Sequence, residues 1–279
     1  MKKNVSQQKV VASDAKKVFR KLGTCSRTFF YLLNREFGEN KETEERAADP
    51  LAGGIMKMGH QCGMLWGASL AVGTEAYKEC RHMSQAIGVS VEATRILMES
   101  FENHENTINC REITGCDFNS KLSFAKYMIS GKFLHCFQLA QDWAPEAVSK
   151  AKKALEYKSY NFEHAMSCAT EVARKMGAND EEMVMVAGFA GGLGLSGSGC
   201  GALSAALWMN ALQWCRDHDA GSATEDPKAK EIIRAFKVFT DESICCEDIS
   251  QTNFGSMKDH TNYLKNGGCS ELIEELSQV

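Results

Sequence analysis

Hydrophobic residues recur along most of the chain at the three- and four-residue spacing of an α-helix, and alternating strand patterns are absent. Residues 6–22 place Val10, Val18, Phe19 and Leu22 among polar side chains, and Gly23 ends this pattern. The chain has only three prolines, so few helical patterns are interrupted. The predicted fold class is therefore all-α, with further helices over 26–37, 62–82, 91–101, 132–142, 160–176, 200–218 and 228–239.

One uncharged stretch has the length of a membrane span. No charged residue occurs from Met183 to Cys215, which is long enough to cross a bilayer. However, seven glycines fall between Gly188 and Gly201, and such a backbone would leave polar groups unpaired in lipid. The stretch is therefore predicted to form a loop and a central helix that the rest of the protein buries, and no membrane span.

The glycine-rich loop occurs twice in the chain. Residues 52–68 align with residues 190–206 without a gap. The identical positions are Ala52, Gly53, Gly54, Gly59, Cys62, Gly63, Leu65 and Ala68, which recur as Ala190, Gly191, Gly192, Gly197, Cys200, Gly201, Leu203 and Ala206. This match predicts an internal duplication. The chain is read as two tandem helical-bundle repeats, 1–146 and 147–279, with Pro145 marking the boundary and each Gly-rich loop leading into a central helix.

Four cysteines per half match in order. They are Cys25, Cys62, Cys110 and Cys136 in the first half, and Cys168, Cys200, Cys246 and Cys269 in the second. Their spacing is too wide for a local metal-binding knuckle, so the signal lies in the recurrence. Helices of a bundle can project distant ligands into one core, and each set of four is predicted to converge on one place.

The remaining four cysteines are predicted not to belong to the matched sets. A straight helix from Cys62 to Cys80 would span about 27 Å, so Cys80 is expected to lie outside the site, as is the similarly placed Cys215. Cys116 and Cys245 have no counterpart in the other half and should tolerate serine better than Cys62 or Cys200. His60 and His135 stand beside matched cysteines, where either could tune a site.

The net charge of the chain and its expected cellular compartment exclude some classes of function. The net charge is −4, with acids and bases interspersed, which excludes a basic nucleic-acid footprint. No secretory signal pattern opens the chain, so a cytoplasmic protein is expected. In that reducing compartment, twelve cysteines are more often metal ligands or redox thiols than disulfides. Neither a nucleotide-binding P-loop nor a haem-attachment motif occurs.

The cysteine order resembles a known family. Tyr160–Ala169 is similar to its opening helix, Gly199-Cys200-Gly201 to its second element, and Cys110-Arg-Glu-Ile-Thr-Gly115 to its third. The family comprises redox-active proteins named for a C…GCAxxG…C…C pattern, here present as two copies of a unit usually found singly. The resemblance implies redox activity, with an iron–sulfur cluster on each set of four cysteines. The chain departs from the pattern at Gln61, at Gly63 and Gly201, and at Trp66 and Ser204.

Three hypotheses remain at this point. The first is an electron-transfer protein with one iron–sulfur cluster per repeat and a separate redox partner protein. The second is a cofactor-free thiol–disulfide oxidoreductase that uses Cys200 or the vicinal Cys245–Cys246 pair. The third is a structural protein whose cysteines bind zinc, since thiolates suit zinc as well as iron–sulfur clusters. Each is compatible with a homo-oligomer.

Overall fold

The computed structural model describes residues 12–156 and 162–279, and these form an all-α protein without β-strands. The first repeat contains α1 Ala15–Leu22, α2 Cys25–Phe37, α3 Glu42–Ala47, the 3₁₀ turn η1 Asp49–Leu51, α4 Gly63–Glu79, α5 Met83–Glu105, α6 Cys110–Thr114, α7 Lys121–Ile129 and α8 Phe133–Leu155. The second contains α9 Cys168–Lys175, α10 Asp180–Met185, η2 Ala187–Phe189, α11 Gly201–Asp217, η3 Ala223–Glu225, α12 Pro227–Phe239, α13 Cys246–Ser250, α14 Met257–Lys265 and α15 Ser270–Gln278.

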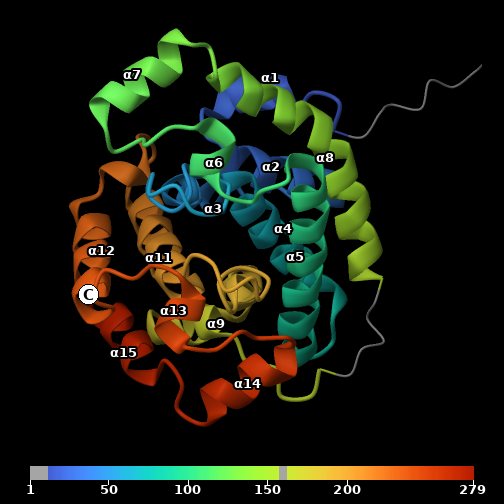
Figure 1. The fold of residues 1–279 in the computed structure, drawn as a ribbon. Coiled ribbons are helices and arrows are strands. Elements are labelled where there is room, and N and C mark those ends of the chain that lie inside the picture. The colour runs from blue at the N-terminus through green and yellow to red at the C-terminus, as the bar shows by residue number, and fades with distance from the viewer. Residues whose placement is uncertain (1–11, 157–161) are drawn as a thin grey trace, which may run out of the picture.

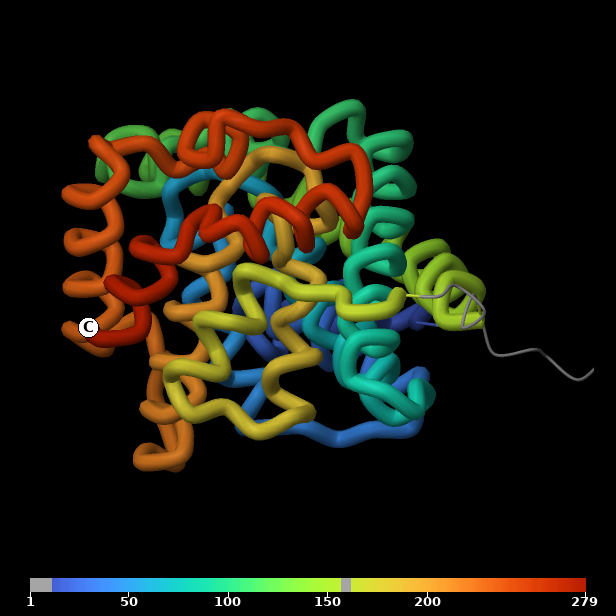
Figure 2. The backbone as a smooth tube through the Cα atoms, turned by 90° about the horizontal axis from the view of Figure 1, so that it is seen from below, coloured from blue at the N-terminus to red at the C-terminus, as the bar shows by residue number. Residues whose placement is uncertain are grey.

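The two repeats lie side by side around a central pair of helices. In Figure 1 the blue-to-green repeat occupies the top and right, and the yellow-to-red repeat the left and bottom. The helices α4 and α11 lie between α5 on one side and α12 on the other. The perpendicular view in Figure 2 also places α5 and α12 at opposite sides of the molecule. Both α4 and α11 are buried around most of their circumference, which accounts for the lack of charge over most of each helix.

A short helix of each repeat packs against the central helix of the other repeat. The helix α3 packs against α11, and α10 packs against α4. The indole N–H of Trp208 on α11 donates to the carbonyl of Glu44 on α3 at 3.4 Å. One hydrophobic core runs through both repeats and includes the buried side chains of Trp66, Trp143 and Trp208. The sequence duplication is therefore built as one packed unit, and the division at residue 146 stays a prediction as a domain boundary.

Pro145 lies inside α8, and the helix predicted over 132–142 continues past this proline, so the predicted end at 142 is wrong. Proline removes one backbone hydrogen bond from a helix and normally disrupts it. Here the apolar face continues on both sides of the proline: Trp143, Ala144, Ala147 and Val148 are all buried against the core. Burial of this face is worth more than the lost hydrogen bond, so the helix continues to Leu155.

The helix predicted over 160–176 starts later than expected. Residues 157–161 lie outside the described part of the chain, and the next helix begins only at Cys168. His164 has a left-handed backbone with φ of 61°, which no α-helix accommodates. The Ser167 hydroxyl donates to the Ala187 carbonyl at 3.0 Å and fixes the chain just before the helix. Tertiary contacts therefore override the helical pattern of this segment.

The uncharged stretch follows the sequence prediction. Its first part forms the end of α10, η2 and the second glycine-rich loop, and its last part forms most of the buried helix α11. Among the described residues, none of the helices combines the length and the apolar character needed to cross a bilayer.

A buried histidine makes stability depend on pH. His260 on α14 is 2% exposed, and burial lowers its pKa to about 4, although a hydrogen bond to the Met166 carbonyl opposes this. The unfolded chain takes up a proton near pH 6.5. The stabilising contribution is therefore complete above pH 6.5 and decreases as the pH falls toward 4, by about 3 kcal/mol in total.

Urea unfolding at pH 7.5 and pH 5 measures this effect. We expect His260→Gln to flatten the pH dependence, because glutamine stays neutral over this range. His104→Gln, at an exposed position on α5, is the matched control and should keep the wild-type dependence. An unchanged pH dependence in His260→Gln would contradict this assignment.

Candidate cysteine sites

All eight matched cysteines lie at the start of a helix. Cys62 and Cys200 directly precede α4 and α11, and Cys136 lies in the first turn of α8. The remaining five hold the first helical position or the position before it: Cys25 in α2, Cys110 in α6, Cys168 in α9, Cys246 in α13 and Cys269 in α15. Unpaired N–H groups and the positive end of the helix dipole favour a thiolate at such positions.

Each glycine-rich loop contains a left-handed turn of five residues. Residues 53–57 have φ between 46° and 74°, and residues 191–195 have φ between 56° and 82°. This conformation is costly for side chains other than glycine, so the tertiary structure has to hold it in place. The first glycine of each turn donates its N–H to the sulfur of the first cysteine, Cys25 in one repeat and Cys168 in the other. The turn therefore contributes directly to the environment of a cysteine.

A two-bond backbone bridge joins the second cysteine to the third. In the first repeat, the Cys62 N–H donates to Ile108 O at 2.7 Å and the Cys110 N–H donates to His60 O at 2.7 Å. The second repeat has the same pair of bonds: Cys200 N–H to Ile244 O at 2.8 Å and Cys246 N–H to Ser198 O at 2.6 Å. The recurrence of this bridge at equivalent positions is structural evidence for the duplication.

The cysteines of the first repeat influence one another, and we call them site 1: Cys25, Cys62, Cys110 and Cys136. The Cys62 thiol hydrogen-bonds to Cys25 and lowers the pKa of Cys25, against the effect of burial. This bond and burial raise the pKa of Cys62 well above its usual range. Burial, followed by the charges of Cys25 and Cys136, raises the pKa of Cys110. Burial also raises the pKa of Cys136 to about 11.

The cysteines of the second repeat form an equivalent group, called site 2: Cys168, Cys200, Cys246 and Cys269. Burial raises the pKa of Cys246, and the charges of the other three thiols add to that effect. Burial raises the pKa of Cys200 to about 12, with a further contribution from Cys269. The pKa of Cys168 is raised by burial and then by Cys200 and Cys269. In each repeat, the four thiols thus act on one another's pKa; their convergence on one centre and ligation by them stay predictions.

The four unmatched cysteines divide into two kinds. Cys80 and Cys215 lie at or near the far ends of α4 and α11 from Cys62 and Cys200. Cys116 is 1% exposed, and its charge contributes to the raised pKa of Cys110. Cys245 likewise acts on Cys200. Each site therefore has a fifth thiol nearby, from a different place in the repeat; their tolerance of serine stays a prediction.

Two tyrosines belong to the sites and were missed from the sequence. The Tyr127 hydroxyl lies 3.4 Å from the Cys136 sulfur, and the Tyr263 hydroxyl lies 3.7 Å from the Cys269 sulfur. These hydrogen bonds lower the pKa of both cysteines, against the larger effect of burial. Each tyrosine precedes a glycine by four residues, Tyr127-x-x-x-Gly131 and Tyr263-x-x-x-Gly267. This repeated Tyr-x-x-x-Gly pattern was the sequence signal that could have identified the two tyrosines.

The glycines after Cys62 and Cys200 are required by close contacts. A Cβ atom on Gly63 would stand 2.5 Å from the Cys25 sulfur, and one on Gly201 would stand 1.8 Å from the Phe189 carbonyl oxygen. Alanine, which the family pattern has at this position, does not fit either repeat of this chain. The departure from the pattern thus reflects how closely α4 and α11 approach their surroundings.

We expect Gly63→Ala to lower the free energy of unfolding by about 1–3 kcal/mol, because the added methyl group overlaps Cys25. Urea unfolding measures the change. Gly255→Ala is the matched control, since its Cβ would come no closer than 3.5 Å to Asp259. Equal stability of both variants would show that Cys25 can move away.

A glutamine joins the two glycine-rich loops across the repeats. Gln61 is fully buried; its side-chain N–H donates to the Gly192 carbonyl at 2.6 Å, and its side-chain oxygen accepts from the Gly199 N–H at 3.1 Å. Gly199 is the equivalent position in the second repeat, and a Cβ there would stand 2.6 Å from the Gln61 oxygen. The Gln61 side chain therefore occupies space that Gly199 leaves empty, and it links the residue before Cys62 to the residue before Cys200.

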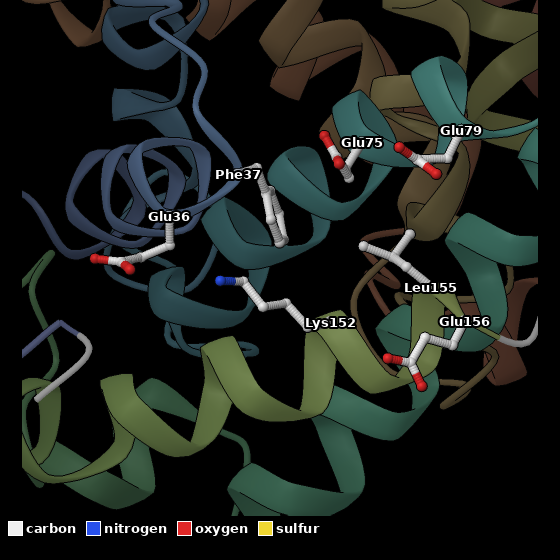
Figure 3. Close-up of a pocket in the computed structure, with 7 residues that line it drawn as sticks. All are labelled: Glu36, Phe37, Glu75, Glu79, Lys152, Leu155 and Glu156. Carbon is white, nitrogen blue, oxygen red and sulfur yellow. The ribbon is translucent and has the colours of Figure 1, made fainter. Parts of the chain in front are cut away.

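Three grooves of the described surface have no cysteine in their lining. Figure 3 shows one of about 480 Å³ between α2, α4 and α8, where Glu36, Glu75 and Lys152 are among the lining residues. No cysteine lines it. Within the described residues, no group of three or more His, Cys, Asp or Glu side chains is arranged to hold a metal ion. The cysteines of each site are buried or half-buried, and they do not form a ready single-ion site.

Comparison with protein families identifies a family whose model matches both halves of the chain. The model of the family described as "Putative redox-active protein (C_GCAxxG_C_C)" matches residues 24–149 and again residues 162–279. Each match covers one glycine-rich loop and one set of four cysteines. No curated protein and no solved structure matched the chain.

Proposed function

The chain belongs to the C_GCAxxG_C_C family of redox-active proteins, in two tandem copies, and from this premise we propose that site 1 and site 2 each hold an iron–sulfur cluster and that the protein transfers electrons. The observation that carries the proposal is that the four helix-start cysteines of each repeat lie near enough for their thiols to act on one another's pKa. The residues proposed to hold the clusters are Cys25, Cys62, Cys110 and Cys136 in site 1, and Cys168, Cys200, Cys246 and Cys269 in site 2.

The chemistry of the thiols fits such a group. Seven of the eight matched cysteines have a pKa raised mainly by burial or by a neighbouring thiol. Buried thiols that repel one another as thiolates need a positive centre to ionise together, and iron supplies it. Backbone N–H groups from the glycine-rich turns and helix starts already point at several of the sulfurs.

A cluster, when bound, would accept and release single electrons. This chain's own residues surround it and set its potential. The backbone N–H groups of the glycine-rich turns donate to Cys25 and Cys168, and the hydroxyls of Tyr127 and Tyr263 bond to Cys136 and Cys269. Hydrogen bonds to ligand sulfurs raise the reduction potential of such centres, and burial of the thiols keeps water away.

An analysis of protein purified without oxygen tests the proposal. We expect a brown protein with iron and acid-labile sulfide in equal amounts, and with a visible band that dithionite bleaches. A colourless protein with zinc and no sulfide would support the structural alternative instead. Absence of both metals and sulfide after reconstitution with iron and sulfide would contradict the proposal.

One contact favours a second candidate, a cofactor-free dithiol. The thiols of Cys25 and Cys62 are in hydrogen-bond contact. Their oxidation to a disulfide would reduce a disulfide substrate to two thiols, with two electrons and two protons passing to it. Mass spectrometry of metal-free protein after treatment with oxidised glutathione would then find Cys25 linked to Cys62. A fully reduced pair would exclude this candidate.

A further inference from the structure

Two equivalent helices of the repeats differ sharply in exposure. Both α7 and α14 precede the last cysteine of a site, and both carry the tyrosine that bonds to it. In α14, four residues are buried, and among them are Met257 and Leu264. In α7, only Tyr127 is buried. The apolar side chains of Leu122 and Ile129 on α7 are 82% and 88% exposed.

The exposed residues form a continuous segment of the chain at the edge of site 1. We call the following the α7 surface: Leu122, Phe124, Lys126, Met128, Ile129 and Leu134. Figure 1 shows α7 on the outside of the molecule, near α6 and the start of α8. Tyr127 lies in the middle of this surface and contacts Cys136 with its hydroxyl. One side chain therefore separates the surface from a cysteine of site 1.

The charges of this segment have one sign. Lys121, Lys126 and Lys132 are exposed, and no acidic residue occurs from Phe118 to Leu134, although the whole chain has a net charge of −4. A symmetric contact between two copies would bring these lysines together, which is unfavourable. An acidic protein surface with apolar residues complements the segment.

The distribution of apolar residues argues against a membrane surface. A helix that lies in a bilayer interface separates its apolar and charged residues onto opposite faces. At 100° per residue, Leu122 and Ile129 lie on a different side of α7 from Phe124 and Met128, and Lys126 stands beside Leu122. No single face of this nine-residue helix is apolar.

We propose that the α7 surface is the docking site of an acidic electron-carrier protein that exchanges one electron with site 1. The inference rests on the proposed function, and it identifies the partner's chemistry. In the exchange, the carrier loses one electron and site 1 gains it. No covalent bond forms or breaks.

The test measures how fast the iron–sulfur protein is reduced without oxygen by a reduced, acidic plant-type ferredoxin, with dithionite as the non-docking reductant. We expect Ile129→Glu to slow reduction by ferredoxin at least about tenfold, because it adds a like charge to an apolar contact. Lys126→Glu should slow it and reduce its dependence on salt. The matched control is Val238→Glu on α12, a side chain that is 80% exposed, which should change the rate less than about twofold.

The outcomes separate this inference from the function it rests on. Dithionite should reduce all variants equally, and failure of dithionite to bleach the wild type would instead contradict the proposed function. Equal ferredoxin rates for wild type and Ile129→Glu would overturn the docking site. Two further results would overturn the docking site. In the first, sedimentation shows a wild-type dimer that the Ile129→Glu substitution dissociates. In the second, the wild type binds anionic phosphatidylserine vesicles and Ile129→Glu abolishes this binding. Reduction of the wild type no faster by ferredoxin than by a small viologen would also overturn it.

Discussion

Replacement of Cys62 by serine is expected to remove the iron and sulfide of site 1 and to leave site 2 loaded, so that the iron content falls to about half. Serine keeps the size of the side chain but loses the soft, easily ionised sulfur that iron–sulfur clusters require. The fold should survive, because Cys62 precedes α4 and its backbone bond to Ile108 does not depend on the side chain. Iron and acid-labile sulfide assays with far-UV circular dichroism measure both effects.

The same helix supplies the control for this prediction. Cys80 lies at the other end of α4, and the 17 residues of the helix span about 26 Å. Cys80→Ser should therefore keep the full iron content. Cys200→Ser and Cys215→Ser form the equivalent pair on α11. Retention of iron in both Cys62→Ser and Cys200→Ser would exclude the two sites, whereas complete loss in either would mean that the sites load together.

Gln61→Leu is expected to lower the free energy of unfolding by about 1–3 kcal/mol, since it leaves one buried backbone N–H without a partner and removes one of two hydrogen bonds to a buried carbonyl. The N–H is that of Gly199, and the carbonyl is that of Gly192, which also accepts from the Ser196 hydroxyl. Leucine matches the size of glutamine, so the loss of the two hydrogen bonds dominates the change. Urea or thermal unfolding measures it.

Gln138→Leu is the matched control, because Gln138 is exposed on α8 and donates to the nearby Asp142 at 2.8 Å. It should change stability by less than about 0.5 kcal/mol. A Gln61→Leu protein as stable as the control would show that water replaces the lost partners. In the predicted case, site 2 should also lose iron more readily than site 1, because Gly192 and Gly199 belong to the loop before Cys200.

The sequence was most informative where one helix carries its own pattern. The helices α11 and α4 were predicted within a few residues, because most of each helix is apolar all round. The same reasoning failed at Pro145, since burial of the flanking residues holds α8 together. The prediction of a helix before Cys168 also failed, because His164 has a left-handed backbone conformation that an α-helix does not accommodate.

The order of the eight cysteines and their duplication could be read from the chain alone, because a repeat needs no knowledge of folding to be recognised. That the four thiols of each repeat act on one another's pKa is a tertiary property: each set comes from four helix starts that are separated by more than twenty residues in the sequence. The tyrosines on Cys136 and Cys269 were not predicted, because Tyr127 and Tyr263 lie at different distances from their cysteines along the chain.

The sequence by itself determined that this protein is all-α, duplicated and a member of a redox-active cysteine family. Only the tertiary structure decided that α3 and α10 each pack against the central helix of the other repeat around one core. The same holds for the Gln61 side chain, which fills the space beside Gly199. The reason is physical. Helical periodicity and repetition are local properties of the chain, whereas the approach of two loops depends on the packing of side chains from both repeats.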